Sequence, residues 1–232
     1  MLSPSVNFSA LQKTTHFRYN KQIHPHPMSA LSPAFDAHIA RKYSLGSLDQ
    51  KVHNKSALQE ELGWPKEPRR PLLCFPAGMT DDMGGALLKD VLPGILSLQV
   101  EILVLGKGSA TYGTLFTELA KQQRHRVHIV AQTDADVSKM YAAADMAMFL
   151  SDTPMKELEH CLSYGVVPVA PHMPSLEDYD PIQERGNAFL FETPTKWLAF
   201  AALVRAVETH KFPFDWRTIQ RHCMESVNAR RA

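Results

Sequence analysis

Short apolar runs alternate with longer segments of helical spacing through most of this chain. The apolar runs lie at residues 71–77, 100–105, 126–130, 145–150, 166–170 and 188–191. Residues 100–105 are nearly all Val, Leu and Ile, which is typical of a strand buried on both faces of a sheet. Helical spacing is found between the runs, at 81–98, 111–121, 134–143 and in the stretch that ends at Tyr164. This alternation predicts an α/β fold with a doubly wound, mostly parallel sheet.

The other segments complete the expected organisation of the chain. Its parts are an irregular N-terminal arm at 1–33, a connecting segment at 34–70, the α/β domain at 71–227 and a tail at 228–232. A short helix is expected over 54–63, with Asn54 as its N-cap and Gly63 at its end. Pro93 is expected to kink the helix over 81–98 or to end it early. The last two helices are expected over 194–209 and 215–227.

The stretch 141–170 contains the expected ligand site. It combines the end of a helix, a buried strand, the loop 151–156 and a further helix and strand. At the carboxyl edge of a parallel sheet, such a loop leads into a helix N-terminus, whose free N–H groups and positive dipole end attract phosphate. The sequence therefore predicts a ligand site at this edge.

The amino-acid composition argues against several classes of partner and site, among them nucleic acid, anionic membranes, disulfides and metals. The 25 basic and 24 acidic residues nearly cancel, so no overall charge favours nucleic acid or an anionic membrane as a partner. Cys74, Cys161 and Cys223 are far apart and odd in number, which favours buried thiols in a reducing compartment over disulfides or a metal site. The sequence shows neither a secretory signal nor a spanning apolar run, so the expected location is cytoplasmic. We expect no cofactor and no metal.

Several motifs in fixed order carry a resemblance to a known family. They are Tyr43-Ser with 54–63, Val104-Leu-Gly-Lys-Gly108 with Tyr112, Tyr141-Ala-Ala-Ala-Asp145, Tyr164-Gly-Val-Val-Pro168, and Asp178-Tyr-Asp-Pro181 with Gly186-Asn-Ala-Phe-Leu-Phe-Glu192. With these motifs, the chain from Tyr43 to Val227 resembles the C-terminal half of bacterial glycogen synthases and plant starch synthases, which are GT-B glycosyltransferases. The resemblance implies a Rossmann-like domain that faces an N-terminal domain across a cleft.

The resemblance also implies binding partners. The family transfers glucose from ADP-glucose to an α-1,4-glucan, and its N-terminal domain holds most of the glucan. This chain begins at a methionine and has no room for that domain, so an N-terminal synthase domain acting in trans is an expected partner. A plant or algal source would make the plastid the expected location instead.

Most of the charges that the family places around the donor phosphates are absent here. Gly78 and Met83 occupy the positions of an arginine and a lysine that neutralise the departing diphosphate. Gln132 occupies the position of an aromatic residue that packs on the base, and Asp152 aligns with a carboxylate and is the candidate catalytic residue. The remaining positions of the implied substrate site are Gly106, Met155, Lys156 and Glu157. Glu157 would repel a diphosphate.

Each of these positions also has a structural interpretation. Gly78 would serve a turn, Met83 and Met155 would fill the core, Glu157 would be a solvated acid in the first turn of a helix, and His160 would be a satisfied histidine. Lys107 and Lys156 are alternative sources of the lost positive charge, because both follow predicted strands.

Two functional hypotheses remain. In the first, the chain is a synthase-like domain that is inactive on its own and either acts as a glucan-associated or regulatory partner or is a truncated remnant. In the second, it is the donor-binding half of a split synthase that a separate N-terminal chain completes. The missing arginine and lysine favour the first.

Overall fold

The computed structural model describes residues 32–151 and 153–231. Residues 1–31 of the arm expected at 1–33, and the candidate Asp152, therefore lie outside the described residues. In the described ranges, six parallel strands form one sheet in the order β3-β2-β1-β4-β5-β6. The strands are β1 (Leu72–Phe75), β2 (Glu101–Leu105), β3 (Val127–Val130), β4 (Met146–Met148), β5 (Val167–Pro171) and β6 (Phe189–Phe191). The predicted doubly wound parallel sheet is confirmed.

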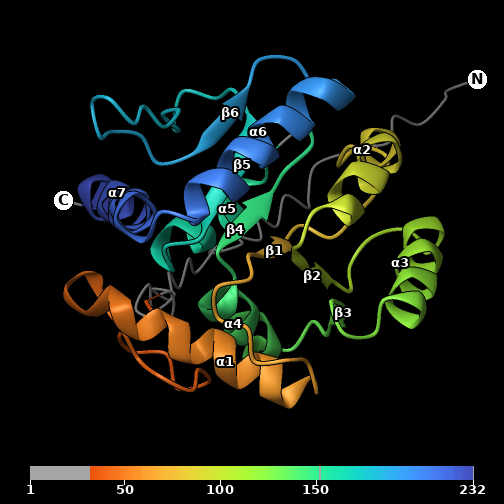
Figure 1. The fold of residues 1–232 in the computed structure, drawn as a ribbon, viewed down its shortest axis with the longest axis horizontal. Helices are drawn as coiled ribbons and strands as arrows, with labels where there is room; N and C mark the ends of the chain where they lie inside the picture. The colour runs from red at the N-terminus through yellow and green to blue at the C-terminus, as the bar shows by residue number, and fades with distance from the viewer. Residues whose placement is uncertain (1–31, 152, 232) are drawn as a thin grey trace, which may run out of the picture.

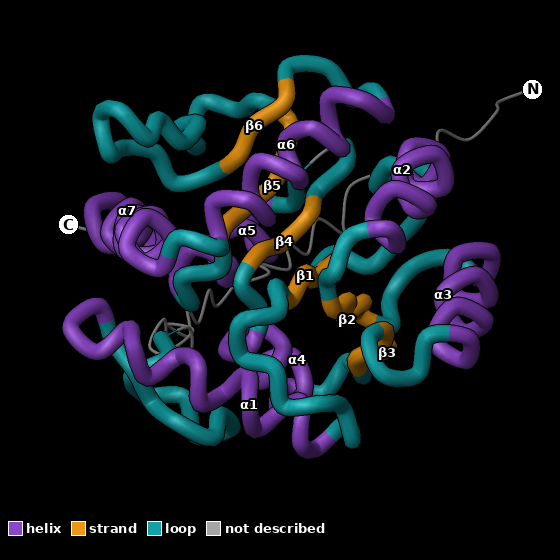
Figure 2. The backbone as a smooth tube through the Cα atoms, viewed as in Figure 1, coloured by secondary structure: helices purple, strands orange, loops and turns teal. Residues whose placement is uncertain are grey.

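Helices cover both faces of this sheet (Figures 1 and 2). The helices of the described chain are η2 (Leu45–Gln50), α1 (Lys51–Glu61), α2 (Gly85–Ser97), α3 (Ala110–Gln122), α4 (Asp134–Ala143), α5 (Met155–Ser163), α6 (Lys196–His210) and α7 (Pro213–Arg231). α2, α3 and α6 lie on one face, and α1, α4, α5 and α7 lie on the other. None of the helices in 32–151 and 153–231 is long and apolar enough to cross a bilayer.

The core lies on both sides of the central strands. All four residues of β1 and all five of β2 are buried, as expected for strands covered on both faces. The three cysteines are buried free thiols. Burial raises the pKa of the Cys74 thiol to about 12, so this thiol is unreactive near neutral pH.

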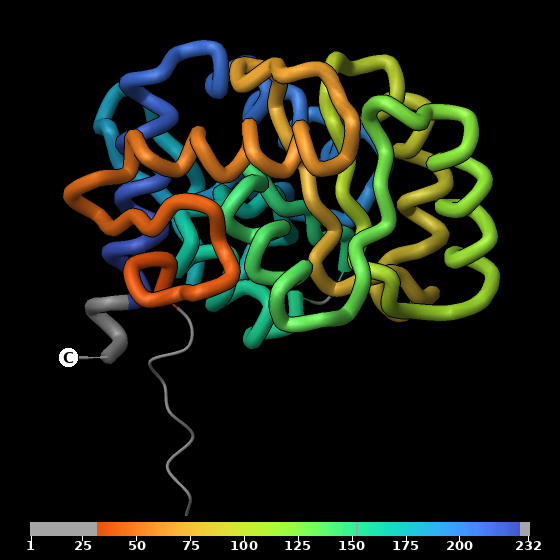
Figure 3. Tube along the Cα trace, turned by 90° about the horizontal axis from the view of Figure 1, so that it is seen from below, coloured from red at the N-terminus to blue at the C-terminus, as the bar shows by residue number. Residues whose placement is uncertain are grey.

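α1 joins this core mainly through polar side chains. It packs on α4 and, in Figure 3, crosses in front of the sheet together with the segment that precedes it. Its buried residues are Lys51, Asn54, Lys55 and Gln59. The Gln59 amide donates to both carboxylate oxygens of Glu101, at 3.0 and 2.8 Å. These buried hydrogen bonds hold a helix that has only a weak apolar face.

One local prediction was wrong, and for Pro93 one of the two predicted outcomes does not occur. Asn54 is not an N-cap, because α1 begins at Lys51 and the Asn54 side chain instead accepts from Arg41 N and donates to Arg41 O, both at 2.8 Å. Pro93 does not end its helix, because α2 continues to Ser97 with Val91 and Ile95 buried on either side of the proline. In both cases tertiary contacts outweigh a local preference.

Candidate functional site

The loops that follow β1 and β2 meet at the carboxyl edge of the sheet. Met79 N donates to Lys107 O and Ser109 N donates to Met79 O, each at 3.1 Å. These bonds form a short parallel bridge between Met79 and Gly108. The loop after β4 joins them, since Ser151 Oγ donates to Asp82 O at 2.5 Å. The backbone thus closes the space above the ends of β1 and β2.

Gly78 lies inside this closed arrangement. Its φ of +71° is a left-handed conformation that side chains other than hydrogen rarely adopt. A Cβ at this position would lie 2.0 Å from Lys107 O and 2.7 Å from Lys107 C. Only glycine fits here without separating the two loops, so no side chain of any charge can start from this position in the observed conformation.

Gly106 and Gln132 meet at the same edge. Gln132 Nε2 donates to Gly106 O at 2.7 Å, and Gly106 N donates to Val130 O at 2.8 Å. The exposed Gln132 amide therefore extends the pairing of β2 and β3. Because residue 132 is a glutamine, no aromatic ring is present at this position to pack on a nucleotide base.

Two charged side chains at this edge, Lys107 and Glu157, pair with each other. Lys107 Nζ lies 3.5 Å from Glu157 Oε1, and the Glu157 side chain is only 16% exposed. Glu157 is therefore not the solvated acid of the structural interpretation. Lys107 likewise does not stand free to replace a lost cation. Lys156 is exposed and forms an ion pair with no acid among the described residues.

The methionines and His160 differ from each other in their surroundings. Met83 is half-buried and packs against the core, as the structural interpretation expected. Met155 is 46% exposed, so it does not fill the core. His160 rests on the edge of the Tyr141 ring, and its buried Nε2 has no hydrogen-bond partner within 32–151 and 153–231. The prediction that this histidine is satisfied was wrong, because one of its ring nitrogens is buried beside an aromatic ring without a hydrogen-bond partner in the described residues.

A small hollow lies between the loop after β2 and the start of α3. It has a volume of about 330 Å³, and Gly106, Lys107, Ser109 and Tyr112 are among the residues that line it. The Tyr112 hydroxyl donates to Asp81 Oδ1 at 2.6 Å, and this bond raises the pKa of Tyr112 to about 12. Lys107 is the one charged residue among the described residues that line this hollow.

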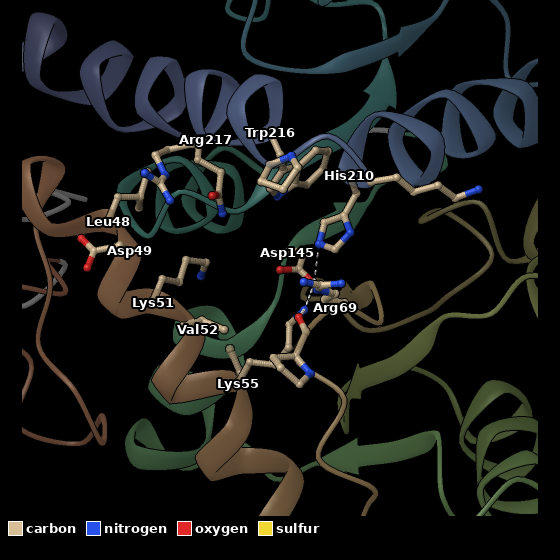
Figure 4. Close-up of a pocket in the computed structure, with 15 residues that line it drawn as sticks. Leu48, Asp49, Lys51, Val52, Lys55, Arg69, Asp145, His210, Trp216 and Arg217 are labelled. Atoms are coloured by element: carbon tan, nitrogen blue, oxygen red, sulfur yellow. Dashed lines mark hydrogen bonds and ion pairs between the residues drawn. The ribbon is translucent and has the colours of Figure 1, made fainter.

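A larger cavity, of about 570 Å³, lies at the opposite, amino-terminal edge of the sheet (Figure 4). Buried Asp145 lies just before β4; it forms an ion pair with Lys55, and its Oδ2 accepts from Leu72 N at 2.7 Å. His210 Nε2, from the end of α6, lies 3.4 Å from the same oxygen. Burial alone would raise the pKa of Asp145, but Lys55 and His210 outweigh it and hold the pKa well below its usual value.

Lys51 forms another part of this cavity. Its Nζ donates to Tyr141 O and Ala142 O at 2.9 Å and lies 3.4 Å from the Tyr43 hydroxyl. Burial lowers the pKa of Lys51 to about 7. No sequence pattern predicts this cavity, although Lys55 and Asp145 both lie inside motifs that carry the family resemblance. In the part of the chain that the structure describes, no cluster of His, Cys, Asp and Glu could hold a metal ion.

Solved structures share this fold. The catalytic domain of starch synthase IV from Arabidopsis thaliana, bound to ADP and acarbose, matches with a TM-score of 0.75 and 22% identity, over 88% of this chain and 46% of that chain. The C-terminal domain of a glycosyl transferase group 1 family protein from Francisella tularensis matches with a TM-score of 0.57 and 11% identity, over 76% of this chain and 92% of that one. The fold is therefore the Rossmann-like half of a GT-B glycosyltransferase.

Sequence comparison identifies curated relatives. No protein-family model matches the chain. Glycogen synthases from Gloeobacter violaceus and Cellvibrio japonicus are 31% and 30% identical to it, over 85% and 83% of this chain and 45% and 42% of their own lengths. The chain is thus homologous to glycogen synthases over most of its own length, and it spans about half the length of the curated relatives that it matches.

Proposed function

We propose that this chain is a glycogen synthase-like glycosyltransferase domain that does not transfer glucose by itself and acts as a non-catalytic partner in glucan metabolism. One observation carries the proposal: the loops after β1 and β2 are joined by backbone hydrogen bonds where the family resemblance locates the donor diphosphate. Gly78 is enclosed in that junction, so the arginine of the family has no place there.

The electrostatics of the carboxyl edge support the same proposal. A departing diphosphate needs preorganised positive charge, and losing one such group commonly costs about 10²–10³ in rate. Gly78 and Met83 supply none, and Lys107 is already paired with Glu157. We therefore expect ADP-glucose to bind weakly and any α-glucan to bind without being extended.

The test is incorporation of labelled glucose from ADP-glucose into glycogen, with calorimetry of ADP-glucose binding. The expected result is no transfer by the chain alone and no low-micromolar binding. The double substitution Gly78→Arg with Met83→Lys should not restore transfer, because the arginine would force the two loops apart. Transfer by the unmodified chain alone would overturn the proposal.

The Lys107–Glu157 pair gives a more sensitive test. At 3.5 Å near the surface, the two charges attract by about 1 kcal/mol in water and more at lower dielectric. Glu157→Gln should free Lys107 and strengthen ADP binding by about fivefold or more. The matched control is the double variant Lys107→Gln with Glu157→Gln, which should lose this gain. If ADP binding is the same in all three proteins, Lys107 does not face the nucleotide.

A second function is supported by apolar side chains at the same edge. Met155, Trp197 and Leu198 lie at the starts of α5 and α6, after β4 and β6, and are 46%, 72% and 45% exposed. Exposed apolar groups at a ligand-facing edge suit an interface with another domain. In this interpretation, a separate N-terminal synthase domain completes a split enzyme. The test adds such a domain in trans to the unmodified chain, and glucose transfer that appears only in the mixture would favour this function over the first.

A further inference from the structure

We propose that the cavity at the amino-terminal edge of the sheet binds a small organic anion, a molecule with a phosphate or similar dianionic group on a compact nonpolar or ring-shaped body. This cavity lies at the ends of the strands opposite to the loops that carry the family's donor positions. Its residues come from η2, α1, the segment before β1, the segment before β4, and α6 and α7. The proposal therefore concerns a site separate from the one discussed above.

The floor of the cavity carries more positive than negative charge. Lys51 and Lys55 are both almost completely buried, and Asp145 is the buried carboxylate beside them. Lys55 is paired with Asp145, whereas the polar contacts of Lys51 in the described chain are two backbone carbonyls and a tyrosine hydroxyl. Burial lowers the pKa of Lys51 to about 7 because its charged form has no carboxylate at ion-pair distance among the described residues, and a bound anion would stabilise that charged form.

The rim adds two guanidinium groups. Arg69 and Arg217 are exposed, and neither forms an ion pair with any residue in 32–151 or 153–231. Figure 4 shows Arg217 on α7 and Arg69 on the opposite side of the opening. Guanidinium groups bind phosphate and carboxylate in a bidentate manner, so two of them on facing sides suit a dianion. Asp49 also lines the cavity, but it is exposed and accepts from the Gln50 amide at 2.7 Å.

The walls favour an organic body on the anion. Leu48, Val52 and Trp216 contribute apolar surface, and Val52 is 40% exposed. Trp216 is buried, and its indole N–H has no acceptor among the residues that the structure describes. This wall residue therefore has a hydrogen-bond donor that a ligand could use. The volume of about 570 Å³ lies within the range of about 300–1,000 Å³ that is usual for small-molecule sites.

The experiment is calorimetric titration of the full chain with three probes: phenyl phosphate, inorganic phosphate and benzyl alcohol. We expect saturable binding of one phenyl phosphate per chain, weaker binding of inorganic phosphate, and none of benzyl alcohol. Arg69→Gln and Arg217→Gln should each weaken phenyl phosphate binding by about tenfold, the usual effect of losing a charge-assisted hydrogen bond. Both positions are exposed, so the variants should remain folded, which circular dichroism would check.

The chain offers matched controls. Arg221 lies one turn after Arg217 on α7 and pairs with Glu225, and Lys66 lies near Arg69 and pairs with Glu60. Neither control residue lines the cavity, so Arg221→Gln and Lys66→Gln should leave binding unchanged. Lys107→Gln, at the other edge, should also leave it unchanged.

Three results would overturn the proposal. The first is the absence of saturable phenyl phosphate binding, and the second is equal weakening by the rim variants and their controls. The third is binding that Lys107→Gln abolishes while Arg69→Gln and Arg217→Gln do not, because the anion would then occupy the carboxyl edge.

Discussion

Replacing Gly78 with alanine tests whether the closed junction of the β1 and β2 loops shapes this protein. The left-handed φ of +71° costs a residue with a Cβ about 1–2 kcal/mol. The new Cβ, 2.0 Å from Lys107 O, would also force apart the backbone bonds that join Met79 to Lys107 and Ser109. Each lost bond contributes about 0.5–1.5 kcal/mol. Gly78→Ala should therefore lower the free energy of unfolding by about 2–5 kcal/mol.

Two other glycines separate these contributions in the same assay, urea unfolding followed by circular dichroism. Gly63 has a φ of +65°, and a Cβ added there would have no neighbouring atom within 4 Å, so Gly63→Ala should show the conformational cost alone, about 1–2 kcal/mol. Gly113 lies within α3 with open space around it, so Gly113→Ala should stabilise the protein by about 0.5–1 kcal/mol. If Gly78→Ala costs no more than Gly63→Ala, the loops separate freely and the junction does not exclude a side chain.

Three further predictions concern the buried charges, each measured by urea unfolding across pH. Asp145→Asn should cost about 3–5 kcal/mol at pH 7 by leaving Lys55 unpaired. The difference should shrink as the pH falls below about 3.8, because the stabilisation from the lowered pKa of Asp145 is complete above that value and is lost progressively as the pH falls toward the folded-state pKa. Burial raises the pKa of Glu101 from 4.5 to about 7, so the folded state holds this proton to a higher pH than the unfolded state does. The free energy of unfolding should therefore fall as the pH rises from 4.5 to about 7, and Glu101→Gln should remove this decline. Burial lowers the pKa of Lys51 from 10.5 to about 7, so the folded state loses this proton at a lower pH than the unfolded state does. The free energy of unfolding should therefore rise as the pH rises from about 7 to 10.5, and Lys51→Met should remove this rise.

The sequence predicted the strands well because burial on both faces leaves a direct mark on composition. Residues 100–105 could be recognised as a central strand from their apolar side chains alone, and β2 occupies Glu101–Leu105. The start of α1 could not be predicted in the same way. The polar character of Asn54 indicates a cap, whereas the structure uses it to bind the backbone of Arg41, a contact that depends on how a preceding segment folds back.

The candidate site was only partly accessible from the sequence. Parallel strands place their following loops at one edge, so the meeting of Gly78, Gly106, Gln132 and Glu157 follows from the order of the elements. What those loops do to each other depends on backbone conformation, and neither the junction at Gly78 nor the pairing of Glu157 with Lys107 has a signature in the linear chain. The role of Asp152 stays a prediction, because this residue lies outside the described ranges.

The two edges of the sheet differ in how their positive charge is used, and this difference can be tested by combining variants. At the carboxyl edge Lys107 is paired with Glu157, whereas at the amino-terminal edge Arg69 and Arg217 have no partner in the described chain. Strands of three to five residues, at about 3.3 Å per residue, separate the edges by roughly 10–16 Å. Sites this far apart that share no partner contribute additively, to within about 0.3–0.5 kcal/mol. Glu157→Gln and Arg217→Gln should therefore change ADP and phenyl phosphate binding independently, and a strong coupling between them would mean that both anions compete for one site.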